Sequence, residues 1–220
     1  MRWLFPIVSL CLLVGCKSND PNAPVTTAGS RTEAASTAEA GWKEISSAGV
    51  AVSFPPNWQA FDLTTSDFNK TMEAAAAKGY VQKEMLDMAK QAASSGIVKL
   101  MVLETGGKDP AFTNNANLVV VPAPAGGSMQ EIVKQTEQQM KTMAKQGSPV
   151  TSRIVSMPAG EVGTIESTLG SDKKTYITFS YIIKHGDKMF VMTYSAPPSE
   201  KDKYRQIADK SMNSFRFTGS

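Results

Sequence analysis

Cysteine and histidine are scarce in this chain of 220 residues, which holds two cysteines and one histidine. Because both cysteines, Cys11 and Cys16, lie near the N-terminus, the rest of the chain has no disulfide, no thiolate nucleophile and no cysteine metal ligand. Any catalytic triad or zinc site would have to use His185, which stands beside Gly186 and Asp187 in a predicted hairpin turn. We interpret His185 as an exposed turn residue, and predict no metal site, no cofactor and no catalytic residue.

An excess of charge of one sign is also missing, since 23 Lys and Arg face 20 Asp and Glu for a net charge of +3. The basic residues form no block, which argues against a nucleic-acid partner. Long apolar runs are absent except for Trp3 to Val14, preceded by Arg2. That run is too short to span a bilayer and has the length of the apolar part of a signal peptide.

The apolar run closes with Leu13-Val14-Gly15-Cys16, a small residue followed by a cysteine. These four residues resemble the lipobox of bacterial lipoproteins. The resemblance implies cleavage after Gly15, a thioether-linked diacylglycerol on Cys16 and usually an acyl chain such as palmitate on the new amine. Three acyl chains, at ~0.8 kcal/mol per buried methylene, would hold the protein on a membrane. A plain secretory signal cleaved near Gly15 and an uncleaved N-terminal anchor are the alternatives.

The residues after Cys16 suggest where the anchor lies and how the chain is divided. In enteric-type bacteria an aspartate at the next position retains a lipoprotein, so Lys17 favours the outer membrane facing the periplasm, a rule without force in a Gram-positive organism. Residues 17–40 are mostly Ser, Thr, Ala, Asn, Pro and Gly, and so predict a flexible tether. We therefore expect a lipoprotein signal peptide at 1–15, a lipidated N-terminus and linker at 16–40, and one domain at 41–220.

Hydrophobic periodicity and turn residues define the elements of this domain. Ala48-Gly49 predicts a tight turn between two strands, Gly79 divides a long helical region, and Ser128 is a candidate N-cap. Short turns between the last four strands predict an antiparallel meander. The predicted elements are strands at 42–45 and 50–54, helical residues 66–94, strands at 97–104 and 118–121, a helix from 128 that ends by 147, strands at 150–157, 161–169, 175–184 and 189–195, and a helix at 200–212.

Two stretches of this pattern resemble the Mog1/PsbP-like family. The first is the apolar strand, prolines and tryptophan of residues 49–58, and the second is the aromatic strand at 190–194 followed by a proline-led helix and Asn213-Ser214-Phe215. The resemblance implies an α+β fold, an α/β/α sandwich on a mainly antiparallel sheet. Members of the family include extrinsic photosystem II subunits, a nuclear small-GTPase cofactor and envelope lipoproteins, and they share docking rather than catalysis. No binding residue can be transferred from them.

Several residue groups admit both a chemical and a structural interpretation. The twelve methionines could supply soft ligands to copper, but their spread over helix and strand faces favours core filling. Gly106-Gly107 and Gly126-Gly127 lack phosphate-loop spacing, although the free N–H groups at Ser128 leave an anion site open. Glu104, Glu161 and Glu166 could serve a hydrolase; we expect solvated positions, with the last two on opposite faces of one strand.

These observations lead to one main functional hypothesis and two alternatives. We expect a non-enzymatic, lipid-anchored envelope protein that docks onto a membrane-associated protein partner, and an exposed aromatic patch would favour it. A carrier of a lipid or small hydrophobic ligand would need an enclosed apolar cavity. A hydrolase would need a buried carboxylate pair in a cleft. We expect the aromatic residues most relevant to this choice to be mostly core: Trp42, Trp58, Tyr194 and Phe215.

Overall fold

The computed structural model describes residues 41–77, 83–105, 112–171 and 174–219. Cys16, Gly15 and the predicted linker lie outside these residues, as do Gly79 and Gly106-Gly107. The elements are β1 (Lys43–Ser47), β2 (Val50–Phe54), β3 (Trp58–Asp62), α1 (Phe68–Ala77), α2 (Lys83–Ser95), β4 (Val98–Glu104), β5 (Asn115–Pro122), α3 (Met129–Met143), β6 (Val150–Met157), β7 (Gly160–Ser171), β8 (Lys174–His185), β9 (Lys188–Ala196), α4 (Lys201–Asn213) and β10 (Arg216–Phe217).

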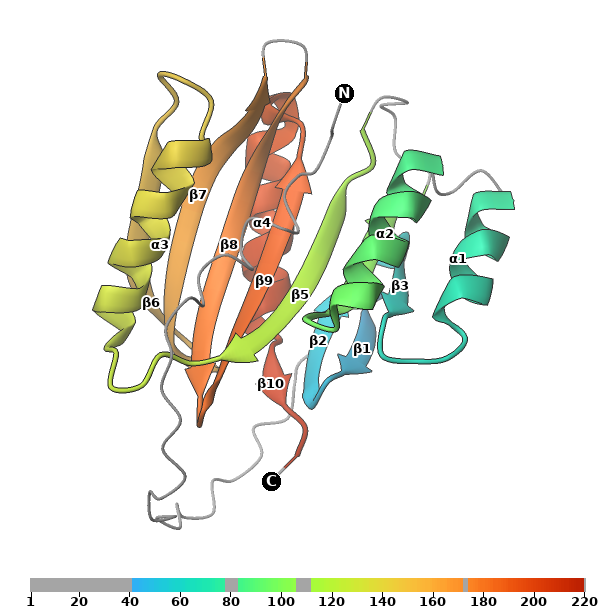
Figure 1. The fold of residues 1–220 in the computed structure, drawn as a ribbon, viewed down its shortest axis with the longest axis horizontal. Coiled ribbons are helices and arrows are strands. Elements are labelled where there is room, and N and C mark those ends of the chain that lie inside the picture. The colour runs from blue at the N-terminus through green and yellow to red at the C-terminus, as the bar shows by residue number, and fades with distance from the viewer. Residues whose placement is uncertain (1–40, 78–82, 106–111, 172–173, 220) are drawn as a thin grey trace.

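The strands form two antiparallel sheets, and the larger one is the middle layer of the fold. Seven strands are joined in the order β3-β4-β5-β9-β8-β7-β6, and β1, β2 and β10 form a small second sheet. In Figure 1, α1, α2 and α3 lie in front of the large sheet, whereas α4 and the small sheet lie behind it. The chain therefore has the expected α+β fold, an α/β/α sandwich on a mainly antiparallel sheet.

Each face of the large sheet has its own hydrophobic core, because strand side chains alternate between the two faces. The front core joins α1, α2 and α3 to the sheet and includes Phe61, Met72, Val133 and Leu169. The rear core joins α4 and β2 to the sheet and includes Phe54, Tyr194, Met212 and Phe215. Both faces are covered over most of their width, which excludes water from the strands between them.

The methionines confirm the core-filling interpretation wherever their side chains are described. Met129 and Met140 on α3 are buried in the front core. Met189 and Met192 on β9 are buried on opposite faces, as their spacing of three predicts. Within the described residues, no group of three or more His, Cys, Asp or Glu side chains is arranged to hold a metal ion.

Most predicted elements are confirmed, with differences at strand ends. The tight turn is present, and its residues Ala48 and Gly49 have φ angles of 54° and 80° in the left-handed region. The four-strand meander β6–β9 is continuous and antiparallel. Two strands were not predicted: β3, which pairs with β4, and β10, which pairs with β2. β10 has only two residues, and the burial of β3 does not alternate along the strand, so neither gives a periodic signal.

A glycine on β7 allows α3 to approach the sheet closely. A Cβ atom at Gly163 would lie 2.3 Å from Cγ2 of Val133 and 3.3 Å from the sulfur of Met129. A side chain at this position would push the helix away from the strand. Among the described helices, none combines the length and apolarity needed to cross a membrane.

Candidate functional site

The rear face of the sheet changes character from its centre to its β6 edge. The register places Thr151 of β6 beside Glu166 of β7, which in turn lies beside Phe179 of β8. The adjacent row is Arg153, Thr164 and Tyr181. In these two rows β8 therefore offers aromatic rings to α4, whereas β6 and β7 offer hydroxyl and charged groups. The rear core is interrupted here and resumes at Val155 and Val162.

Charged side chains of α4 extend across this boundary. The guanidinium of Arg205 lies 4.8 Å from the ring centre of Phe179, within the range of a cation–π interaction. Arg205 also forms an ion pair with Glu166, and Nζ of Lys201 lies 2.5 Å from the other oxygen of that carboxylate. Glu166 is thus held by two cations from α4, with its side chain 19% exposed.

Tyr181 connects the floor of this region to the helix. Its hydroxyl donates a 2.7 Å hydrogen bond to Oδ1 of Asp209, one turn beyond Arg205 on α4. Burial raises the pKa of the Tyr181 hydroxyl, and the hydrogen bond to Asp209 raises it further. The phenol therefore stays neutral and acts as a hydrogen-bond donor over the physiological pH range.

These groups surround a hollow of about 310 Å³ between the outer strands and α4, which we call the groove. Within the described part of the chain, the guanidinium of Arg153 takes part in no ion pair and is exposed. Among the described residues, the guanidinium of Arg153 is thus free to bind an anionic group in the groove, while the nearby carboxylate of Glu166 is neutralised by two cations. Its lining residues are Thr151, Ser152, Arg153, Thr164, Ile165, Glu166, Phe179, Ser180, Tyr181, Arg205 and Asp209.

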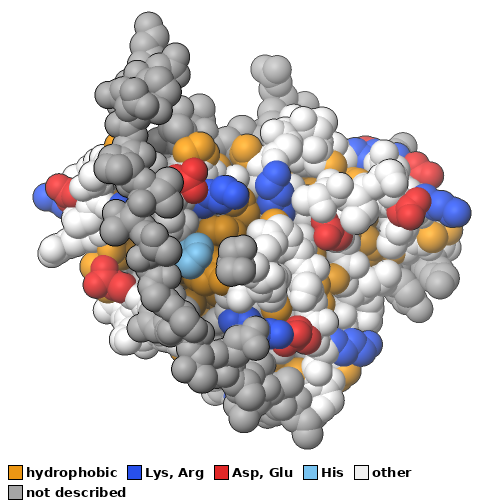
Figure 2. All heavy atoms as spheres, turned by 90° about the horizontal axis from the view of Figure 1, so that it is seen from below, with side chains coloured by type: hydrophobic (Ala, Val, Ile, Leu, Met, Phe, Trp, Pro, Cys, Tyr) orange, Lys and Arg blue, Asp and Glu red, His pale blue; other side chains and the backbone are white. Residues whose placement is uncertain are grey.

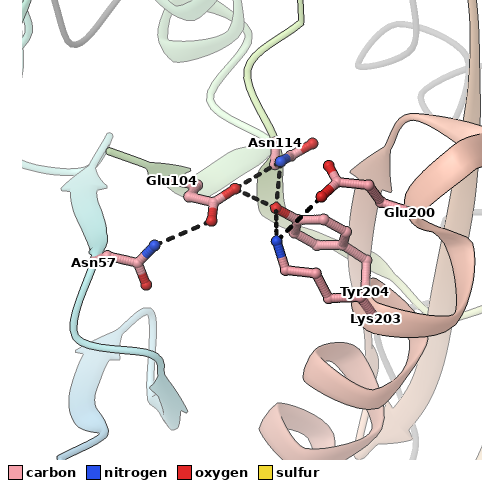
Figure 3. A network of polar contacts seen from close by, with 6 residues as sticks. All are labelled: Asn57, Glu104, Asn114, Glu200, Lys203 and Tyr204. Atoms are coloured by element: carbon pink, nitrogen blue, oxygen red, sulfur yellow. Dashed lines mark hydrogen bonds and ion pairs between the residues drawn. The ribbon is translucent and has the colours of Figure 1, made fainter. Parts of the chain in front are cut away.

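A second polar cluster lies at the other end of α4 and centres on Glu104 (Figure 3). Tyr204 and Asn114 both donate to Oε2 of this carboxylate, the amide at 2.6 Å, and Asn57 donates to Oε1 at 3.0 Å. The expectation that Glu104 is solvated is wrong, because the residue is 9% exposed. Burial raises the pKa of Tyr204, as does its hydrogen bond to Glu104.

This cluster joins four separate segments and has the character of a structural cross-link. Asn57 precedes β3, Glu104 ends β4, Asn114 precedes β5 and Tyr204 lies on α4. Lys203 closes the cluster towards solvent, with Nζ 3.2 Å from both the Tyr204 hydroxyl and Glu200. The buried carboxylate of Glu104 accepts from three donors, and the second carboxylate of the cluster, Glu200, contacts Lys203 rather than Glu104 (Figure 3).

The other sequence candidates fall at separate places. His185 is exposed at the β8–β9 hairpin as predicted, and its ring stacks on Phe217 with 3.8 Å between ring centres. Figure 2 shows the histidine, in pale blue, beside hydrophobic side chains on the lower end of the molecule. Glu161 is exposed and faces away from Glu166, as the odd spacing predicts. Three of the four aromatic residues predicted as core are buried: Trp58, Tyr194 and Phe215, whereas Trp42 is half-buried.

The anion site left open at the start of α3 is already occupied by a side chain of the protein. Glu131 accepts hydrogen bonds of 2.9 Å from the backbone N–H and from the hydroxyl of Ser128. The Ser128 hydroxyl in turn accepts from the Glu131 N–H at 3.2 Å, which completes a capping box. The hydrogen bond from the Ser128 backbone, followed by that from its hydroxyl, lowers the pKa of Glu131.

Comparison with known proteins identifies similarity at the level of structure. No protein-family model and no curated protein matches the chain. PsbP from the cyanobacterium Synechocystis sp. PCC 6803 is similar at 11% identity and a TM-score of 0.48, covering 84% of this chain and 98% of that one. LpqN of Mycobacterium tuberculosis, involved in cell envelope biogenesis, has 9% identity and a TM-score of 0.49, with 81% and 91% covered. The Ran-binding protein Mog1p of Saccharomyces cerevisiae has 8% identity and a TM-score of 0.45, with 80% and 96% covered.

Sequence reasoning singled out Glu166 but missed the other groove residues. Arg153, Arg205 and Asp209 are ordinary charged residues in an amphipathic strand and helix, and nothing in their spacing marks them. Only the pairing of β6 with β7 and the position of α4 bring them together. Thr151 and Arg153, at alternate positions of β6, were the available signal, since polar residues there predict that this part of the strand's face is not core.

Proposed function

We propose that this protein is a lipid-anchored, non-enzymatic protein of the bacterial cell envelope that binds a membrane-associated protein partner. Residues Leu13 to Cys16 support the anchor, since they match a lipobox at the end of a signal-length apolar run. Cys16 would carry the lipid after cleavage at Gly15. Lys17 favours the outer membrane, facing the periplasm, in a Gram-negative organism.

The groove is the observation that carries the binding part of this proposal. It holds the guanidinium of Arg153, which forms no ion pair with any described residue, beside hydroxyl groups and the aromatic rings of Phe179 and Tyr181. A planar guanidinium binds a carboxylate through two parallel hydrogen bonds, and this geometry is one reason why arginine is frequent at protein interfaces. The groove therefore suits an acidic segment of a protein partner that lies across β6 and β7.

The groove's chemistry fits the alternatives less well. A carrier of a hydrophobic ligand needs an apolar cavity, whereas this hollow is lined by two arginines and two carboxylates. A general acid needs a carboxyl group whose proton is retained near neutral pH. Glu166 instead forms ion pairs with Lys201 and Arg205, and Asp209 accepts a hydrogen bond from Tyr181.

Chemical cross-linking in intact envelopes followed by affinity capture tests the proposal. The capture compares the wild-type chain with Arg153→Glu, which reverses the charge in the groove. Lys188→Glu is the matched control, because it makes the same charge change on an exposed residue of β9 at the opposite end of the meander. We expect a reproducible protein whose yield falls at least tenfold with Arg153→Glu and not with Lys188→Glu. Equal capture by all three chains would overturn the assignment of the groove.

A further inference from the structure

β6 is a free edge of the large sheet without the usual protection against pairing. It pairs with β7 over all eight of its residues with no shift in register, and within the described residues no strand lies on its other side. Edge strands are commonly protected by bulges, lysines or internal prolines. β6 has none of these, and its one charge, Arg153, belongs to the groove.

The middle of this edge carries an exposed apolar side chain. Ile154 is 39% exposed, and among the described residues no other large hydrophobic side chain is as exposed. It lies opposite Gly163 of β7, which has no side chain to pack against it. A strand that paired with this edge would cover the isoleucine, so Ile154 gives the edge an apolar contact as well as free backbone groups.

Three hydrogen bonds show which backbone groups of β6 point outward. Thr164 donates through its hydroxyl to the carbonyl of Arg153, so that carbonyl points toward β7. The carbonyl of Ser167 points toward β8, and that of Thr168 points away from β8, where it accepts from Lys145. Because N–H and C=O groups of successive residues alternate sides, the outward groups of β6 belong to Ser152, Ile154 and Ser156.

We propose that a second copy of this chain pairs with the free edge, β6 against β6, about a two-fold axis through Ile154. The two-fold axis that relates two antiparallel strands is perpendicular to the sheet, so the rotation leaves every side chain on the same face of the sheet. Two residues can therefore pair across the interface only if their side chains lie on the same face. Centring the axis on Ile154 satisfies this condition and uses the outward-pointing groups. Ile154 then pairs with Ile154 of the other copy, Ser152 with its Ser156, and Ser156 with its Ser152. Each of these three pairs forms two hydrogen bonds, about six between the chains in all.

This register also brings no like charges into direct opposition. Arg153 of one copy lies opposite Val155 of the other, whereas an axis centred on Arg153 would place two guanidinium groups face to face. Pro158, directly after β6, occupies an outward position and has no N–H to donate, which limits the pairing to Thr151 through Met157. The sequence thus limits the length of the interface.

The helix layer accommodates the second copy. α3 packs on β6 and β7, so its axis lies above the space between these two strands. With strands ~4.8 Å apart, joining two sheets at β6 places the two α3 helices about 10 Å apart, an ordinary packing distance for helices. Ile154 of both copies would be covered between them. The two grooves would lie next to each other on the rear face, with the two-fold axis between them.

Disulfide trapping tests the register. The full chain carrying Cys11→Ser and Cys16→Ser has no cysteine, and Ile154→Cys or Ser156→Cys then introduces one. Directly opposed residues have Cα atoms about 5.5 Å apart, which a disulfide can bridge. Cysteines at 156 would be about four residues apart along the strands and out of reach. We expect at least tenfold more cross-linked dimer with Ile154→Cys, and equal or reversed yields would overturn the proposal.

Molecular mass in solution tests the pairing itself. Light scattering on the same cysteine-free chain is expected to show mass rising toward that of two chains with increasing concentration. Ile154→Lys places like charges opposite each other at the axis and should shift half-dimerisation to at least tenfold higher concentration. Its circular dichroism should be unchanged, as should its thermal unfolding at concentrations where both chains are monomeric. A constant monomer mass in the parent chain, or a dimer unaffected by Ile154→Lys, would overturn the proposal.

Discussion

Tyr204 on α4 donates its hydroxyl hydrogen to the carboxylate of Glu104 on β4, across 100 residues of sequence (Figure 3). The bond joins the helix behind the sheet to the end of a central strand. Both residues are buried, with exposed fractions of 1% and 9%. Because an ionised or unpaired carboxylate is costly to bury, the three donors to Glu104 make this position of α4 part of the fold's stability.

Replacing Tyr204 with phenylalanine tests this role. Tyr204→Phe keeps the ring but leaves Glu104 and Asn114 without the hydroxyl, so the free energy of unfolding should fall by about 1–3 kcal/mol. Urea denaturation measures the change. Tyr176→Phe is the control, because the Tyr176 hydroxyl is buried and has no hydrogen-bond partner among the residues that the structure describes. Its removal should leave stability unchanged or slightly higher. A loss of equal size in both variants would contradict the proposed role.

Gly163 should tolerate no side chain while α3 keeps its present position. Gly163→Ala places Cβ 2.3 Å from Val133, and we expect the free energy of unfolding to fall by about 1–3 kcal/mol. Thermal and urea unfolding measure this loss. In the double variant Gly163→Ala, Val133→Ala, the space vacated by the valine should make the alanine at 163 much less costly than it is alone. If the two losses simply add, the clash with Val133 is not the cause.

The capping box at the start of α3 predicts a pH dependence of known sign. The folded-state pKa of Glu131 is lowered from 4.5, so its stabilising contribution is present above that value and is lost as the pH falls through the folded pKa. The difference in stability between wild type and Ser128→Ala should therefore narrow in acid. NMR titration should find the Glu131 pKa closer to 4.5 in Ser128→Ala, and an unchanged value would contradict the hydrogen-bond assignment.

Cys16→Ser tests the lipid anchor. Without the thiol there is no thioether, so the variant should leave the membrane fraction and lose incorporation of labelled palmitate. Fractionation of cells expressing each chain measures both. Cys11→Ser is the matched control, since it changes the other cysteine but leaves the lipobox residues intact. A Cys16→Ser chain that is still membrane-bound and labelled would disprove lipidation at this residue.

Local chemistry made much of the fold predictable. Neighbouring residues decide three features: the Ala48-Gly49 turn, the Ser128 cap and the short turns of the meander. These features can therefore be predicted from the sequence. β10 was missed because two residues carry no periodic pattern, and β3 because its two buried residues, Trp58 and Phe61, lie three apart in different cores and give no alternation. The burial of Glu104 was not predicted, because its three hydrogen-bond donors come from three other segments and no local sequence pattern indicates that they meet.

The sequence by itself determined the lipobox interpretation of Cys16, the absence of cysteine from the remaining chain, the alternation of β6–β9 and the α+β class. Tertiary structure decided which charged residues meet. One groove is lined by Arg153, Glu166 and Arg205 only because β6 pairs with β7 and α4 lies beside these two outer strands. The same pairing leaves Ile154 at an open edge. Strand order and helix position depend on contacts between distant segments, and a pattern of neighbouring residues does not contain them.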